Sequence, residues 1–175
     1  MRIQALPLKM TEAEAMKIAQ QRGNIFGRLL LGRKNITLKL IYMENKEIVY
    51  RITDRSLFKL RRRKGQMERI RMLVEGTGCS PAYLDRELQT QPVQVDNESQ
   101  LQHSTFPDEK MIEAGRYLGR RMIHRQSGRN VSMEIEHIQS IYRPYYIAFY
   151  GELEEGTRVR YLPIPADGNE IRRVF

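Results

Sequence analysis

The chain has 175 residues, a formal net charge of +9, no tryptophan and a single cysteine, Cys79. Its share of Leu, Ile, Val and Met excludes a wholly disordered chain and suffices for an ordinary globular core. One cysteine excludes an internal disulfide, and no apolar run approaches the roughly 20 residues of a membrane helix. We therefore expect a cytoplasmic protein with no membrane partner, although a chain trimmed of a leader would read the same.

The first half of the chain predicts a helix followed by three strands. Thr11 and Glu14 have the spacing of a capping box, and a modest apolar stripe of helical period follows them. From Asn35 the apolar period changes to two, which predicts a strand over about 36–40. Two further strands are expected over about 47–53 and 68–74, with a long basic connection between them.

Residues 85–104 are polar, rich in Gln and weakly acidic, which is typical of a linker or surface loop. Val93 and Val95 are the only strand-like feature in this stretch.

The second half repeats the order of the first. Thr105 and Asp108 give another Thr-x-x-acid start, with Pro107 in the first turn and Gly128 at the end of the helix. Strands are then expected over about 131–136, 141–150 and 157–162.

Four pairs of sequence anchors suggest that the two halves are copies of one unit. Gly32-Arg33 corresponds to Gly128-Arg129, Ile41-Tyr42 to Ile141-Tyr142, Tyr50 to Tyr150, and residues 69–73 to residues 158–162. We therefore expect an α+β fold of two tandem α-β-β-β repeats, with antiparallel sheets and helices packed on one face. The predicted repeats span 9–84 and 105–175, joined by the polar linker 85–104. They could share one core or merge their sheets at an edge.

This order of elements resembles the helix-plus-meander of PepSY-type or cystatin-like modules. The resemblance implies a tandem module that binds or inhibits rather than catalyses, and it carries over no site residues.

The chain lacks the sequence motifs of phosphate-binding loops, dinucleotide folds, zinc proteases and Cys-x-x-Cys centres. Its histidines do not have ligand spacing, and a metal site would need them to converge with carboxylates. Glu134 and Glu136 share one strand face, where a solvated surface is the simpler interpretation than a catalytic pair. Cys79 would need a nearby histidine to act as a nucleophile. We therefore expect no enzymatic activity, no metal and no cofactor.

Two basic clusters and one acidic patch are the candidate binding residues. The first basic cluster comprises Lys59, Arg61, Arg62, Arg63 and Lys64, and the second comprises Arg116, Arg120, Arg121 and Arg125. The acidic patch comprises Glu152, Glu154 and Glu155, at the corner of the second repeat that matches the basic loop of the first. The two corners could be solvated hairpin tips, or they could pair within or between molecules.

The main functional expectation is a non-catalytic protein-interaction or assembly module, self-associating or bound to a protein partner. Pairing at exposed strand edges is one way in which it could associate. The alternative is nucleic-acid binding, in which the basic clusters contact phosphates and aromatic residues on the sheet stack on bases. The stacking candidates are Tyr42, Tyr50, Tyr145 and Phe149.

Overall fold

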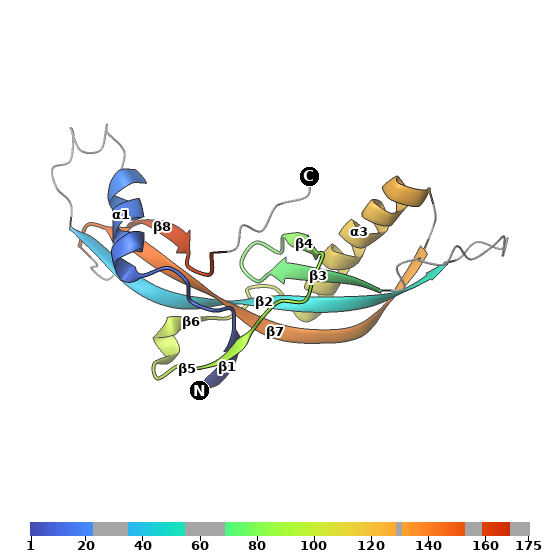
Figure 1. Cartoon of the computed structure of the whole chain (residues 1–175), viewed down its shortest axis with the longest axis horizontal. Helices are drawn as coiled ribbons and strands as arrows, with labels where there is room; N and C mark the ends of the chain where they lie inside the picture. Colours follow the sequence, from blue (N-terminus) through green and yellow to red (C-terminus); the bar gives the residue numbers. More distant parts are fainter. Residues whose placement is uncertain (23–34, 55–68, 129–130, 153–158, 169–175) are drawn as a thin grey trace. The chain divides into compact units, whose positions relative to one another are not determined.

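The computed structural model describes residues 1–22, 35–54, 69–128, 131–152 and 159–168. These residues form an α+β fold with two α-helices and a mixed sheet of eight strands (Figure 1). The chain divides into two compact units whose segments alternate along the sequence. Unit 1 comprises Met1–Met43, Thr90–Gln102 and Tyr142–Glu170, and unit 2 comprises Glu44–Gln89, His103–Ile141 and Ile171–Phe175.

Unit 1 contains one helix, strands that belong to it alone, and one half of each of two long strands. Its own elements are β1 (Arg2–Ala5), α1 (Glu12–Arg22), β5 (Gln91–Gln94), the 3-10 helix η1 (Glu98–Gln100), β6 (Leu101–Gln102) and β8 (Arg160–Pro165). The long strands are β2 (Ile36–Asp54) and β7 (Val131–Tyr150). β1 pairs antiparallel with β5 and parallel with β7, β6 pairs parallel with β2, and β8 pairs antiparallel with β7.

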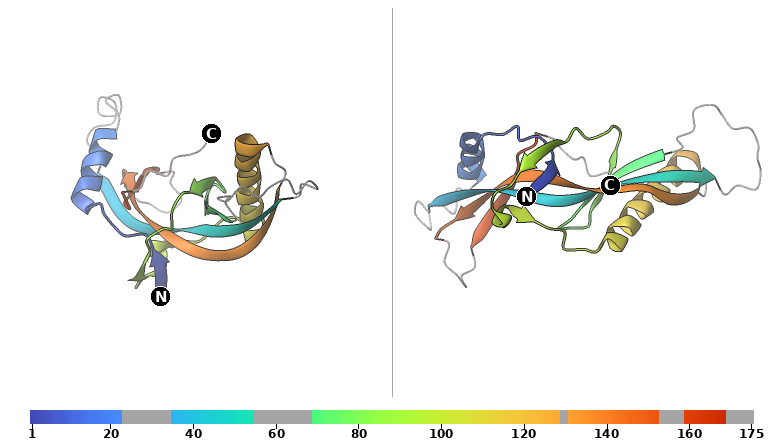
Figure 2. Two further views of the ribbon diagram at one scale, coloured as in Figure 1. Left: turned by 45° about the vertical axis from the view of Figure 1, so that its right-hand side comes forward. Right: turned by 90° about the horizontal axis from the view of Figure 1, so that it is seen from below.

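Helix α1 begins with the predicted capping box and covers one face of the unit 1 strands. The Glu14 carboxylate accepts from the Thr11 backbone N–H at 2.8 Å, and the Thr11 hydroxyl accepts from the Glu14 N–H at 3.3 Å. Ala15 and Ala19 are fully buried against Tyr146 and Ala148 of β7 and Ile164 of β8. Figures 1 and 2 show α1 beside β8. Small residues on α1 let its backbone approach the sheet closely.

Unit 2 contains α3 (Asp108–Ser127), β3 (Arg69–Glu75), β4 (Pro81–Leu84) and the remaining halves of β2 and β7. β3 pairs antiparallel with β2 on one side and with β4 on the other. The apolar face of α3 lies on the sheet, where Met111 and Leu118 are buried against Ile48, Tyr50 and Met72. Gly128 ends the helix as predicted: its φ is 65° and its N–H donates to the His124 carbonyl at 2.7 Å.

The start of α3 differs from the prediction. The residue that precedes the helix is Pro107, which has an extended conformation and makes no side-chain capping bond. Thr105 is exposed, and the local turn is instead held by Ser104, whose hydroxyl donates to the Phe106 carbonyl at 2.8 Å. The capping-box spacing therefore predicted the helix correctly, but it did not predict that Ser104 holds the turn before it.

Three other fold predictions need correction. The sheet is mixed rather than antiparallel, because β1 runs parallel to β7 and β6 runs parallel to β2; neither β1 nor β6 was predicted as a strand. The stretch 85–104 contains β5 and β6, and Val95 is buried in a cluster with Ile3 and Tyr142. Finally, 36–54 and 131–150 are each one continuous strand, where two were expected in each stretch.

The helices pack on strands from opposite halves of the sequence. α1, from the first half, packs on β7 and β8 as well as on the start of β2. α3, from the second half, packs on β2 and β3 as well as on the start of β7. The compact units are therefore interleaved along the chain, and the boundaries 9–84, 85–104 and 105–175 remain a prediction about sequence repeats. Neither described helix is both long and apolar enough to cross a membrane.

Candidate functional site

The predicted binding residues that the structure describes lie mainly on α3. The first basic cluster (59–64) and two residues of the acidic patch, Glu154 and Glu155, lie outside the described residues. Glu152 is described, belongs to unit 1 and is exposed. The proposed pairing of basic and acidic corners therefore remains a prediction.

Helical period decides which α3 side chains reach solvent. Met111, Gly115, Leu118 and Gly119 face the sheet and are buried, so the residues on the other side of the helix are exposed. Residues 116–125 contain four arginines and no acidic residue. The exposed residues of this segment, which we call the α3 basic face, are Tyr117, Arg120, Arg121, His124 and Arg125.

Arg116 does not belong to the α3 basic face, although the sequence grouped it there. Its side chain is only 20% exposed, and its guanidinium pairs with Glu113 one turn earlier. Its Nε is buried and has no hydrogen-bond partner in the described part of the chain. Its charge is therefore largely neutralised within the helix.

Arg120, Arg121 and Arg125 differ from Arg116 because they are exposed and form no ion pair with a described acidic residue. They follow one another within two turns of the helix, so that their guanidinium groups share one side. No described acidic residue neutralises this charge, which can therefore attract an anionic ligand.

The described ends of β2 and β3 lie in unit 2 and are held by contacts with β7 and α3. Arg69 donates to Glu136 of β7 through Nε at 2.7 Å, and Arg51 of β2 lies 4.0 Å from the same carboxylate. Ile52 and Ile70, next to these arginines, pack in the same cluster as Ile123 near the end of α3. Figures 1 and 2 show the end of β2 and the end of α3 at the same end of unit 2.

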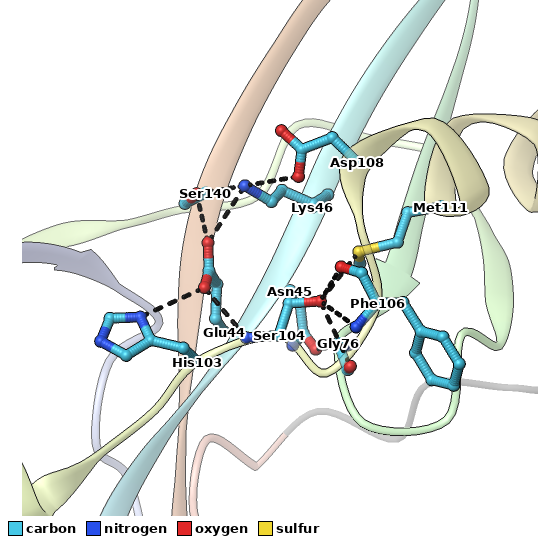
Figure 3. Close-up of polar contacts among 10 residues, drawn as sticks. All are labelled: Glu44, Asn45, Lys46, Gly76, His103, Ser104, Phe106, Asp108, Met111 and Ser140. Atoms are coloured by element: carbon cyan, nitrogen blue, oxygen red, sulfur yellow. Dashed lines mark hydrogen bonds and ion pairs between the residues drawn. The ribbon is translucent and has the colours of Figure 1, made fainter.

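A second polar site, missed in the sequence, lies where β2, β7 and the loop before α3 meet in unit 2 (Figure 3). Glu44 is 9% exposed and accepts from the Ser140 hydroxyl at 2.7 Å and from the Ser104 backbone N–H at 3.1 Å. Lys46 lies 3.1 Å from Glu44 and 3.1 Å from Asp108. We call this group the Glu44 cluster: Glu44, Lys46, His103, Ser104, Asp108 and Ser140.

The surroundings of Glu44 and Lys46 stabilise the charged form of each side chain. Burial alone would raise the pKa of Glu44, but hydrogen bonds from Ser140, Ser104 and Lys46 outweigh it and lower that pKa to about 2. Burial would lower the pKa of Lys46, yet Asp108 and Glu44 raise it. A carboxylate with so low a pKa is a weak base, and an ammonium held this firmly is a poor proton donor near neutral pH. Ser140 donates to Glu44 and accepts from Lys46 at 3.0 Å, so the cluster forms a polar cross-link between β2 and β7.

Neighbouring contacts continue this cross-link. Glu47 of β2 is 1% exposed, pairs with Arg71 of β3 at 2.7 Å, and accepts from Gln139 of β7. The Asn45 side chain accepts from the Gly76 N–H at 3.2 Å. These partners explain why β2 continues through the polar run 44–47 and β7 through 137–140. The sequence shows these polar residues between apolar ones, but not the distant partners that let each strand continue.

The other residues singled out in the sequence do not gather into a metal site in the described part of the chain. No group of three His, Cys, Asp or Glu side chains gathers there. His103 lies 3.4 Å from Glu44, whereas His124 and His137 are exposed on different elements. Cys79 lies in a turn with φ of 51°, and its Sγ is 3.8 Å from the Lys110 carbonyl.

The aromatic residues nominated for stacking are mostly buried. Tyr42, Tyr50 and Tyr145 have exposures of 7%, 0% and 8% and belong to the core. Phe149 is half-buried beside Tyr161 and Lys39 in unit 1. The tyrosines that do reach solvent are Tyr117, 68% exposed, and Tyr161, 63% exposed. The sequence alone does not show that Tyr117 and Tyr161 are exposed while the other tyrosines are at least partly buried, because exposure depends on tertiary contacts.

Comparisons with protein-family models, curated proteins and solved structures gave no match.

Proposed function

We propose that this chain is a non-catalytic binding module whose partner is a nucleic acid, bound through the α3 basic face. The observation that carries the proposal is that Arg120, Arg121 and Arg125 are exposed on one side of α3 without described acidic partners. Such a surface attracts phosphates and releases the counterions condensed on them, whatever the base sequence.

The non-catalytic part of the proposal is supported by the Glu44 cluster. The low pKa of its Glu44 carboxylate suits strand cross-linking better than proton transfer. A surface of arginines, by contrast, needs only exposure and charge to bind.

The proposal is tested with two triple variants of equal charge. The first is Arg120→Gln/Arg121→Gln/Arg125→Gln. The control is Arg2→Gln/Arg86→Gln/Arg160→Gln, which removes three exposed arginines that lie elsewhere. Binding of a labelled oligonucleotide is measured by fluorescence anisotropy over a series of salt concentrations.

We expect the affinity of the α3 variant to fall about tenfold or more and that of the control to fall much less. For a single strand, each phosphate that an arginine neutralises adds about 0.7 to the slope of log K against log salt, so the slope of the α3 variant should be smaller by about 2. Equal decreases in both variants would mean that only the overall charge matters, and the proposal would be wrong.

Assembly through strand edges, the first expectation from the sequence, is less well supported. β4 includes Pro81, β5 includes Pro92, and β8 includes Pro163 and Pro165. Proline cannot donate to a strand ladder and is a common means of blocking edge pairing.

Self-association through the basic and acidic corners stays a prediction. Light scattering of Arg61→Glu/Arg62→Glu/Arg63→Glu tests it, because reversing the charge of one corner should separate molecules that pair through it. An unchanged mass and melting temperature would count against it.

We also propose that the two halves of the chain arose by duplication. The contacts of Tyr50 and Tyr150 support this. Each lies towards the end of a long strand and donates its hydroxyl to a helix carbonyl: Tyr50 to Ile112 at 2.6 Å, and Tyr150 to Ala19 at 2.9 Å. Each also lies opposite the strand that follows in sequence, Tyr50 opposite Ile70 and Tyr150 opposite Arg160. This register differs by one residue from the sequence alignment, in which Ile70 matches Val159.

A further inference from the structure

Tyr117 occupies the only position of the α3 basic face that carries a tyrosine ring. It precedes Arg120 by three residues and Arg121 by four, so both guanidinium groups lie on the same side of the helix as its ring. The ring is 68% exposed and takes part in no aromatic pair or cation–π contact within the described residues. The neighbouring apolar positions of α3, in contrast, are buried against the sheet.

We propose that the ligand of the α3 basic face is a single-stranded nucleic acid, with one unpaired base stacked on Tyr117 and the flanking phosphates bound by Arg120, Arg121 and Arg125. This inference rests on the proposed function and specifies its substrate class. Stacking on an aromatic side chain tolerates any base and adds about 1–3 kcal/mol per base. A paired base in a duplex is already stacked on its neighbours, and its face is not available to Tyr117.

The dimensions of the face suit a short stretch of one strand. Tyr117 and Arg125 are separated by eight residues, which is about 12 Å along the helix axis. The rise per nucleotide along the axis of a duplex is roughly 3.4 Å, and an extended single strand has a larger rise, so this length corresponds to at most about three or four nucleotides. One stacked base and three phosphate contacts fit within that length.

The test uses Tyr117→Ala, with Tyr161→Ala as the control because Tyr161 is comparably exposed in unit 1. Three probes of equal length are compared: a single-stranded oligonucleotide, the corresponding duplex, and a single strand whose bases have been removed. The last probe keeps the phosphates and removes the stacking partner. Tyr117→Phe keeps the ring and should behave as the unmodified protein does.

We expect Tyr117→Ala to weaken binding of the normal single strand about 5- to 150-fold, the range that corresponds to one stacked base. Binding of the abasic strand and the salt slope should not change, because no charge is removed. Tyr161→Ala should leave all three affinities unaltered. The unmodified protein should bind the single strand more tightly than the duplex.

Two failures can be told apart. If the arginine variants bind more weakly but Tyr117→Ala does not, or if the duplex binds as tightly as the single strand, the face binds phosphates alone; the inference is then overturned and the proposed function stands. If no probe binds, or if the α3 arginines make no specific contribution, both are overturned. Circular dichroism of each variant verifies that the fold is retained.

Discussion

Glu44 has an environment very different from that of a free side chain in water. It lies within a strand and almost out of contact with solvent, yet Ser140, Ser104 and Lys46 all stabilise its charged form. A buried charge is tolerated only when such partners surround it, and removing one partner leaves the rest unsatisfied. Glu44 should therefore influence stability more than its single charge suggests.

The pH dependence of stability should reveal this contribution. The folded-state pKa of Glu44, about 2, lies below the unfolded value of 4.5, so its contribution is fully present above pH 4.5 and is lost as pH falls towards 2. Glu44→Gln should lower the free energy of unfolding at pH 7 by about 2–3 kcal/mol. The difference between variant and unmodified protein should shrink below pH 4.5. Urea denaturation at about pH 7 and about pH 3 measures both effects.

Glu134→Gln is the matched control, because Glu134 is exposed on β7 and has no ion pair among the described residues. Equal destabilisation by the two substitutions, or a difference that stays constant as the solution is acidified, would contradict this account of Glu44.

At the scale of elements, α3 approaches the sheet closely because two glycines face it. A Cβ at Gly115 would lie 2.7 Å from the Tyr50 hydroxyl, and one at Gly119 would lie 2.5 Å from the terminal methyl of Met133. The Tyr50 ring is fully buried and its hydroxyl is bonded to Ile112 of α3, whereas a methionine end can rotate away. The two glycines should therefore differ in their tolerance of alanine.

Gly115→Ala should destabilise the protein by about 1–3 kcal/mol, although alanine is the better helix former by about 1 kcal/mol. Gly119→Ala should be close to neutral or slightly stabilising. In a Tyr50→Phe background, where the clashing hydroxyl is gone, Gly115→Ala should cost less, and a double-mutant cycle of thermal or urea unfolding measures the coupling. Additive effects of the two substitutions would show that the hydroxyl is not the obstacle.

The sequence predicted most elements where a local signal defines them. The capping box at Thr11 and the helix end at Gly128 are confirmed because their hydrogen bonds involve residues within a few positions. The breaks expected within β2 and β7 were wrong because polar residues there find partners far away: Ser140 reaches Glu44 across 96 positions of sequence. Periodicity cannot show such partners.

The candidate site was predictable only in part for the same reason. The sequence identified the arginines of α3, since composition alone reveals them. It could not show that Arg116 is paired with Glu113, or that Tyr117 is exposed while Tyr50 is buried. Exposure depends on which side of the helix meets the sheet.

At the scale of the whole molecule, the interleaving of the two units along the sequence is the dominant feature. Each helix finds part of its apolar contacts on strands from the other half of the sequence. A fold dominated by contacts between distant residues forms slowly, because long loops must close before the contacts stabilise them.

We therefore expect neither half to fold by itself. Fragments 1–89 and 90–175 should each show little helix by circular dichroism, because α1 and α3 lack the strands that cover them. Mixing the two fragments should restore helical signal and a cooperative thermal transition. A stable, cooperatively melting fragment on its own would contradict the expectation and favour two self-sufficient repeats.

The contact between Tyr150 and Ala19 also bears on how the protein emerges from the ribosome. The two residues are 131 positions apart, so α1 is synthesised long before the strand that covers it. At roughly 5–20 residues per second, the wait is about 7–26 s. During translation the nascent α1 therefore exposes an apolar stripe for many seconds. We expect a chaperone to bind this stripe until β7 is synthesised.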